Sequence, residues 1–497
     1  MLMKKTGFCF VFCFAILYSN AQPVTVNEIN RVNPPGLALA PLRFLASDEL
    51  MGRATTRPEI HIAARYISEQ FRSFGLKEMA GTQDYVQSFK LRMISPSTNG
   101  SLVVGNKTYH MGSDLLQVRG TGVQLVAPVV FAGFGTSADL SGLDVKDKIV
   151  VVNMGESDST TVREANRFRE TKQKLLKEKG ALALVERYWQ PDSEWELPKH
   201  AYSSQRAFAS PDSLLPVFII HDPAGEFLVS VKSAATCTIN SAGSNLIEVP
   251  AKNVMGWVEG TDPLLRNQFL VLSAHYDHVG VAPVAKMEEG KLDSIYNGAR
   301  DNAVGVTAVI NAARFFALHP AKRSILFIAF TGEEMGLLGS KYFASHPTIG
   351  LEKIIYNLNI DNGGVNDTSL INVIGLGRTT ADDDIKKACL AYGFTLRGDP
   401  APEMNLFDRS DNVSLAAKGV PAPTYGMGVK KVDESIMRYY HQLADEIGNL
   451  DLGYIVKYMN SFILAASYIA DNPAQPHWKS GDKYEAAWKK LYSNPNQ

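Results

Sequence analysis

Two adjacent glutamates, Glu333 and Glu334, stand in "TGEEMGLLGS", directly after the apolar run "SILFIAF". Neighbouring carboxylates repel each other, and a shared cation relieves that repulsion. One glutamate of such a pair can bind a metal ion while the other takes a proton from a water that the metal has acidified. The spacing alone does not say which glutamate has which role.

Further candidate ligands follow other apolar stretches of the second half of the chain. They are His275, Asp277, Asp301, Asp361, His441 and Asp445. Histidines together with carboxylates form a ligand set that suits zinc, and less strongly manganese or cobalt. There are more candidates than one ion uses, which argues for two ions that share a carboxylate. Asp301, in the middle of the set, is the natural choice for the shared residue.

Each candidate also has an ordinary structural explanation. A histidine near a strand end is more often structural than metal-binding, Asp301 could cap the next helix, and Asp361 could be a turn residue. Glu333 and Glu334 could interact with a helix dipole. If these explanations were correct, all of these residues would lie at the same edge of one sheet by chance. We therefore favour a metal site.

The elements that must position these residues alternate between strand and helix. From about residue 245 onward, "QFLVLSAH", "SILFIAF" and "KIIYNLNID" are typical of buried strands, and "NAVGVTAVINAARFFAL" is typical of a buried helix. This alternation indicates a largely parallel sheet covered on both faces. Ligands bind beyond the carboxyl ends of such strands, where the candidates lie.

The first half of the chain has a different texture. Strand-like runs such as "KDKIVVVNMG" surround the charged helical segment "REANRFRETKQKLLKEKG", which predicts a compact α/β insert. We expect a signal peptide at 1–21, a discontinuous main domain at 22–118 and 245–480, an insert at 119–244 and a C-terminal tail at 481–497.

The N-terminus is typical of a secretory signal peptide. Lys4 and Lys5 precede the apolar run "GFCFVFCFAILY" and the small residues before a cleavage point after Ala21. The alternative to a signal peptide is that this apolar run forms a buried helix. We expect export to the periplasm or beyond, with no membrane anchor in the mature chain. Its two cysteines, Cys237 and Cys389, are too few for a disulfide scaffold, and the sequence leaves their pairing open.

The composition excludes some classes of partner. Lys plus Arg number 50 against 51 for Asp plus Glu, so the basic excess of a nucleic-acid-binding protein is missing. The apolar fraction of 45% is that of a globular protein, and 497 residues predict roughly two or three structural units. The oligomeric state stays open, with a homodimer as one option.

The ordered motifs "SAHYDHVG", "NGARDNAVG", "FTGEEMGLLGS", "NLNID" and "YYHQLADE" resemble those of the co-catalytic, di-zinc exopeptidase family. That family contains bacterial leucyl aminopeptidases and glutamate carboxypeptidases and, with its ligands lost, the transferrin receptor. The resemblance covers nearly the whole mature chain, and residues 119–244 resemble the family's inserted protease-associated domain. It implies an α/β fold: a mostly parallel mixed sheet sandwiched by helices, with a smaller inserted α/β domain.

The resemblance also implies a role for each site residue. One zinc ion would be bound by His275 and Asp361, the other by Glu334 and His441, and both by Asp301, with manganese or cobalt as substitutes. The catalytic residues would be Glu333 as general base, Asp277 orienting His275, and Tyr440 steadying the oxyanion, with Asp445 in a supporting part.

This sequence departs from the family's pattern at three positions. Arg300 stands where many relatives carry an acid and is expected to draw off negative charge. Asn412 stands where relatives often have histidine, which we interpret as a change in a substrate-side loop. His278 is not a ligand by this mapping and is expected to be an ordinary polar residue.

The implied function is that of a secreted metallo-exopeptidase acting on peptides. We favour an aminopeptidase because Arg300, Arg409 and Arg438 are scattered, whereas a carboxypeptidase uses an arginine cluster for the terminal carboxylate. The alternatives are a glutamate-carboxypeptidase-like enzyme or a dipeptidase, and a non-catalytic binding protein on the same fold. Glutaminyl cyclases usually lack the insert, which counts against that reading.

Overall fold

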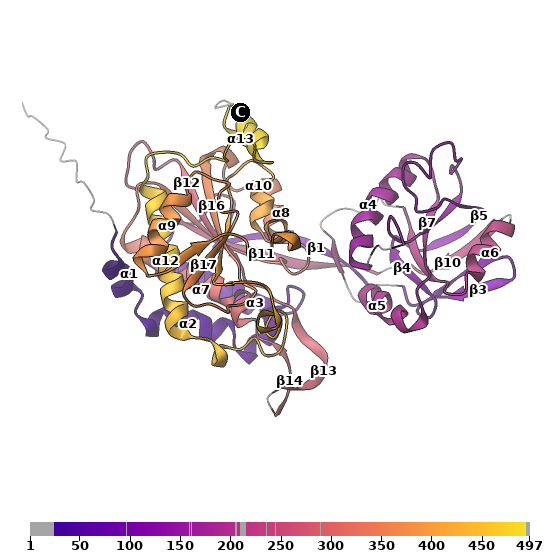
Figure 1. Ribbon diagram of the computed structural model, residues 1–497, viewed down its shortest axis with the longest axis horizontal. Helices are drawn as coiled ribbons and strands as arrows, with labels where there is room; N and C mark the ends of the chain where they lie inside the picture. Colours follow the sequence, from indigo (N-terminus) through magenta and orange to yellow (C-terminus); the bar gives the residue numbers. More distant parts are fainter. Residues whose placement is uncertain are drawn as a thin grey trace, which may run out of the picture.

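The computed structural model describes residues 24–95, 97–158, 160, 162–203, 206–208, 215–234, 236–243, 245–288 and 290–493. The predicted signal peptide therefore lies outside the described residues. Figure 1 shows a large lobe and a smaller lobe, joined by the long strands β1 (Val86–Ser95) and β11 (Asn245–Val258).

The large lobe is built on a nine-stranded mixed sheet with the order β18-β17-β19-β16-β12-β15-β11-β1-β8. Its four central strands, β19, β16, β12 and β15, are parallel to one another, while β11 and β17 pair with them antiparallel. The remaining bounds are β8 (Arg206–Phe208), β12 (Phe269–His275), β15 (Ser324–Phe330), β16 (Ile354–Ile360), β17 (Leu370–Ile374), β18 (Thr395–Arg397) and β19 (Thr424–Met427). Because the central strands run the same way, their carboxyl ends meet at one edge.

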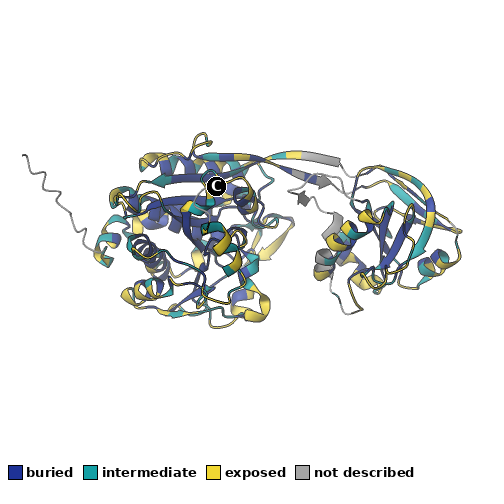
Figure 2. Cartoon of the chain, turned by 90° about the horizontal axis from the view of Figure 1, so that it is seen from above, coloured by how far each residue is buried: buried dark blue, intermediate teal, exposed yellow. Residues whose placement is uncertain are grey.

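Helices cover both faces of this sheet. Alternate residues of β12 point to opposite faces: Leu270 and Leu272 pack into one core, and Phe269 and Val271 into another. The first core is closed by α2 (Pro35–Leu45), α3 (Glu59–Ser73), α7 (Val304–Leu318), α9 (Asp382–Ala391) and α12 (Leu452–Asp471). The second is closed by α8 (Leu338–Ser345), α10 (Asn412–Ala416) and α13 (Glu485–Tyr492). The expected α/β class with a helix-covered mixed sheet is confirmed, and Figure 2 shows its strands as mostly buried.

The smaller lobe has its own sheet of eight strands, in the order β3-β2-β10-β5-β6-β7-β9-β4. These are β2 (Gly100–Val104), β3 (Lys107–His110), β4 (Leu115–Arg119), β5 (Val123–Phe131), β6 (Ile149–Asn153), β7 (Ala183–Tyr188), β9 (Val217–His221) and β10 (Thr236–Ser241). The helices are α4 (Val162–Glu178), α5 (Asp192–Ser203) and α6 (Glu226–Ser233). The sheet begins near Gly100, earlier than the expected 119, because β2, β3 and β4 are only 5, 4 and 5 residues long and short runs are hard to recognise in sequence.

Shorter elements complete the large lobe. They are α1 (Val26–Val32), the helical turns η1 (Asp48–Arg53), η2 (Ala299–Ala303), η3 (Leu351–Lys353), η4 (Pro402–Met404), η5 (Leu406–Arg409) and η6 (Ile447–Asn449), α11 (Glu434–Met437), and the hairpin β13 (Gly280–Glu288) and β14 (Lys291–Tyr296). Figure 1 shows the hairpin projecting from the body of the lobe. Among the described residues no helix has the length and apolar character needed to cross a membrane. Cys237 and Cys389 are both buried and unpaired with each other.

Candidate metal centre

The candidate residues gather at the carboxyl edge of the central sheet. His275 is the last residue of β12, Asp361 follows β16, and Glu333 and Glu334 follow β15 after a short turn. Asp301 lies in η2 directly before α7. These elements bring together side chains that lie far apart in the sequence.

The first group of candidate ligands contains His275, Asp301 and Asp361. The Nε2 atom of His275 lies 3.2 Å from Oδ1 of Asp361 and 3.3 Å from Oδ1 of Asp301. The other ring nitrogen, Nδ1, lies 3.1 Å from the backbone carbonyl oxygen of Asp277. A proton on Nδ1, donated to that carbonyl, would leave the Nε2 lone pair available to a metal ion that the two carboxylates also face.

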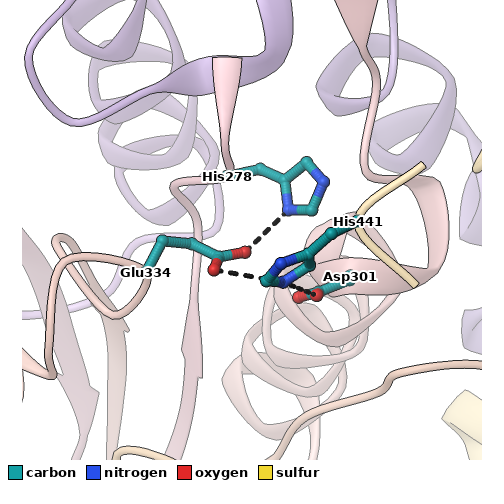
Figure 3. A group of neighbouring side chains, drawn as sticks. All are labelled: His278, Asp301, Glu334 and His441. Carbon is teal, nitrogen blue, oxygen red and sulfur yellow. Dashed lines mark hydrogen bonds and ion pairs between the residues drawn. The ribbon is translucent and has the colours of Figure 1, made fainter. Parts of the chain in front are cut away.

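The second group contains His278, Asp301, Glu334 and His441 (Figure 3). The Nε2 atom of His441 lies 3.1 Å from Oδ2 of Asp301 and 3.2 Å from Oε2 of Glu334. The other oxygen of Glu334, Oε1, lies 2.9 Å from Nδ1 of His278. Asp301 therefore belongs to both groups, and it turns a different oxygen toward each.

The spacing of these donor atoms fits metal ions. Ligand atoms about 2.0–2.1 Å from a tetrahedral zinc ion lie about 3.3 Å from one another. The histidine-to-carboxylate distances of 3.1–3.3 Å in the two groups match that value. Imidazole and carboxylate donors in buried surroundings also match the chemistry of zinc.

The pKa shifts of the residues in the metal-free centre also fit a site for cations. Burial alone would lower the pKa of His441, but its hydrogen bonds with Asp301 and Glu334 raise that pKa to about 10. Burial would likewise raise the pKa of Asp301, yet hydrogen bonds with His275 and His441 hold it well below its usual range. In the metal-free centre, protonated imidazoles thus balance the negative charge of the carboxylates. Bound metal cations would take over this role.

Glu333 belongs to neither group of candidate ligands. Its side chain lines a cavity next to the cluster, together with His275, Asp301 and Asp361. Loss of solvent around the carboxyl, reinforced by the charges of Asp361 and Asp411, raises the pKa of Glu333 well above its usual value. A carboxyl that is basic, unligated and beside a metal site suits the transfer of protons.

Asp277 contacts its neighbours differently from the expectation. Its carboxylate lies 3.9 Å from Nδ1 of His275, and the backbone carbonyl makes the closer contact. The carboxylate instead accepts hydrogen bonds from the Thr55 hydroxyl at 2.8 Å and from the backbone N–H of Glu333 at 3.2 Å. Asp277 thus orients His275 through its main chain and Glu333 through its side chain.

Tyr440 also lines the cavity. Its ring stacks on His441, with the ring centroids 4.1 Å apart. Its hydroxyl accepts a hydrogen bond from Nη2 of Arg409 at 3.3 Å. Much of the remaining wall is apolar and includes Ile374, Met404, Leu406, Val432, Ile436 and Met437.

Two further titratable residues lie near the candidate ligands and were not predicted as site residues from the sequence. His278, expected to be an ordinary polar residue, is fully buried and contacts Glu334. Asp411 is fully buried, and burial raises its pKa to about 7. The second histidine of "HYDH" was a usable signal for His278, whereas nothing in the pattern around Asp411 distinguishes it from a turn residue.

Asn412 and Arg300, two of the three departures from the family pattern, make identifiable contacts in the structure. Asn412 is buried in α10 and donates a hydrogen bond to the carbonyl of Ala422 at 3.1 Å, so it supports the packing of the chain. The guanidinium of Arg300 pairs with Asp445 at 2.9 Å, whereas Asp301 pairs with histidines. The guanidinium of Arg300 thus has Asp445 as its direct partner, and its effect on the charge of the candidate ligands stays a prediction.

Known peptidases resemble this chain in sequence and in fold. Residues 253–466 match the model of peptidase family M28. The aminopeptidase YwaD of Bacillus subtilis (strain 168) is 24% identical over 335 residues, which cover 66% of this chain and 63% of the relative. A probable zinc metalloprotease of Pyrenophora tritici-repentis is 30% identical over 117 residues, covering 24% of this chain and 23% of the relative. The chain thus spans less than two thirds of either relative.

A solved structure with a similar fold is the aminopeptidase from Aneurinibacillus sp. strain AM-1. It superposes with a TM-score of 0.60 at 20% identity, covering 91% of this chain and 97% of the other. This likeness extends over both lobes and supports the fold assignment.

Proposed function

Because this chain belongs to peptidase family M28, we propose that it is an exported metallo-exopeptidase that binds two zinc ions and releases N-terminal residues from peptides. The observation that carries the proposal is the arrangement of Asp301. Its two carboxylate oxygens face His275 and His441, at 3.3 and 3.1 Å. A carboxylate that faces both groups in this way could bridge a pair of metal ions.

We assign the ligands accordingly. His275 and Asp361 would hold one ion, Glu334 and His441 the other, and Asp301 both. Bound zinc would supply an acidified water and would polarise the scissile carbonyl. Manganese or cobalt would suit the same donors less well.

The protein's own residues would then move the protons. Glu333 would accept a proton from the attacking water and return it to the leaving amine, and its raised pKa supports this role. The backbone hydrogen bond from Glu333 to Asp277 would keep the carboxyl in place. The hydroxyl of Tyr440, beside His441 in the cavity wall, would donate to the developing oxyanion.

The lining of the cavity favours an aminopeptidase. Its apolar wall would accept an apolar side chain of the N-terminal residue. Arg409 is the arginine in this wall, and its guanidinium already bonds to Tyr440. A terminal carboxylate would usually be held by several cationic groups, so carboxypeptidase or dipeptidase activity is the second candidate, with Arg409 as its anchor.

We also infer the location of the protein, the identity of its smaller lobe and the class of its partners. The start of the sequence supports cleavage after Ala21 and a periplasmic or extracellular location. We assign the smaller lobe as a protease-associated domain inserted into the peptidase domain. The family match supports peptides as the partners, and the balanced charge of the chain argues against nucleic acids.

The experiment uses one peptide in two forms, with a free and with an acetylated N-terminus. Each is incubated with the zinc-loaded protein, and the products are followed by mass spectrometry. We expect stepwise loss of residues from the free N-terminus and no cleavage of the acetylated form. Loss of residues from the C-terminus of the acetylated peptide would move the protein to the carboxypeptidase class. Full zinc loading without cleavage of either form would overturn the proposed activity.

A further inference from the structure

The Arg300 side chain lies next to Asp301 in sequence but turns away from the candidate metal ligands. It is 3% exposed, and its Nη1 atom donates to Oδ1 of Asp445 at 2.9 Å and to Oδ1 of Asn449 at 3.0 Å. Its Nη2 atom donates to the backbone carbonyl of Asn449 at 2.9 Å. The guanidinium carbon lies 3.8 Å from the centre of the Tyr439 ring, so the planar group also stacks on an aromatic face.

Asp445 extends this contact to the backbone around Asp301. Its carboxylate accepts hydrogen bonds from the backbone N–H of Arg300 at 3.0 Å and from that of Asp301 at 3.2 Å. The backbone carbonyl of Asp445 accepts from the N–H of Ala299 at 3.1 Å. Three successive N–H groups of the 299–301 turn are thus held by one residue of the distant 438–449 segment.

The 438–449 segment carries His441 and has little regular structure of its own. It joins α11 to α12 through turns, and His441 adopts a left-handed conformation with φ 55°. The side chain of His441 is 33% exposed, so core packing does not fix its position. The Arg300 contacts flank it instead, at Tyr439 on one side and at Asp445 and Asn449 on the other.

We propose that Arg300 is a positioning residue, which joins the turn of Asp301 to the segment of His441 and so sets the affinity of the metal ion that these two residues share with Glu334. The inference rests on the proposed function, because it assumes a metal ion between those ligands. Arg300 and Asp445 neutralise each other in buried surroundings, and the fork of the guanidinium binds several acceptors at fixed angles. Lysine keeps the charge but loses the fork and the stacking.

The test compares Arg300→Lys with Arg323→Lys. Arg323 is a matched control because it is 1% exposed, bonds to backbone carbonyls at 470 and 473, and precedes β15 at the opposite edge of the sheet. Zinc stoichiometry and stepwise affinity are measured for the whole protein by competition with a chromogenic chelator. Visible spectra of the cobalt-loaded proteins report on ligand geometry.

We expect the wild type and Arg323→Lys to bind two zinc ions with the same affinities. Arg300→Lys should keep the ion held by His275 and Asp361, bind the other about 10–100-fold more weakly, and change the spectrum of the second cobalt ion. Tyr439→Leu, which removes only the stacking surface, should weaken the same ion by a smaller factor. It serves as the test if Arg300→Lys does not fold.

Three results would overturn the inference. If the wild type binds two ions and the affinities and spectrum of the tested variant equal those of the wild type, Arg300 does not position the site. Equal weakening of both ions, matched by Arg323→Lys, would show a general loss of stability. A wild type that binds fewer than two ions would instead refute the proposed function itself, and the inference with it.

Discussion

Replacing Glu333 with glutamine should slow turnover by orders of magnitude while the proposed metal ions stay bound. The amide has the size of the carboxyl but cannot accept a proton at neutral pH, so the water loses its base and the leaving amine its acid. General acid–base catalysis contributes about 10²–10⁴-fold, which is about 3–5.5 kcal/mol of activation free energy. We therefore expect kcat to fall by that factor while KM changes little.

The structure also predicts what this substitution leaves intact. Glu333 is outside both ligand groups, so Glu333→Gln should bind zinc like the wild type. The backbone N–H that donates to Asp277 is unaffected by the side chain. In the metal-free protein the raised pKa of Glu333 means that stability falls as pH rises above the carboxyl's unfolded value, about 4.3. Glutamine does not ionise, so Glu333→Gln does not lose stability in this way as pH rises. The melting temperature of the metal-free variant at pH 7 should therefore equal or exceed that of the metal-free wild type.

The assay pairs steady-state kinetics on an aminoacyl anilide with zinc analysis by mass spectrometry. Glu334→Gln is the control, because it removes a candidate ligand and should lower both zinc content and activity. Wild-type kcat in fully loaded Glu333→Gln would refute the assignment of the base. Loss of zinc from Glu333→Gln would refute the assignment of Glu333 as a residue that does not bind metal.

Three further outcomes are expected. His278→Ala removes the contact to Glu334 and should weaken one zinc ion about 10–100-fold, as measured by chelator competition; unchanged affinity would contradict a role for His278. Ile436→Ala shortens the cavity wall and should reduce the preference for leucine over alanine N-termini about tenfold in kcat/KM, and an unchanged preference would exclude this wall as the side-chain pocket. The pKa of His441 is raised to about 10 in the metal-free protein, so the stability it contributes is complete below about pH 6.5 and is lost as pH rises toward 10. The melting temperature of chelator-treated protein should therefore fall between pH 7 and 10, and that of His441→Gln should fall less; equal pH profiles would refute this.

Periodicity predicted β12 and β15 well, because both strands are buried on both faces and most of their residues are apolar. The run "SILFIAF" coincides with β15, and the run ending at His275 with β12. The residues that follow these strands come to one edge because the strands are parallel. The clustering of the candidate ligands was thus predictable wherever these residues adjoin regular elements.

The irregular segments could not be predicted in the same way. Asp277 and His278 lie in the irregular segment between β12 and β13, and only the packed structure sets which group of Asp277 meets His275. The direction of Arg300 is another case: it adjoins Asp301, but the turn of η2 sends the two side chains apart. Its partner Asp445 is distant in sequence, and no local pattern connects the two residues.

A crystal structure of the zinc-loaded protein, with anomalous scattering measured at the zinc edge, tests the central claim most directly. The proposed centre predicts two anomalous peaks that share Asp301, one between His275 and Asp361 and the other between Glu334 and His441. A single peak there, or zinc bound elsewhere while these residues still pair with one another, would contradict the two-ion centre.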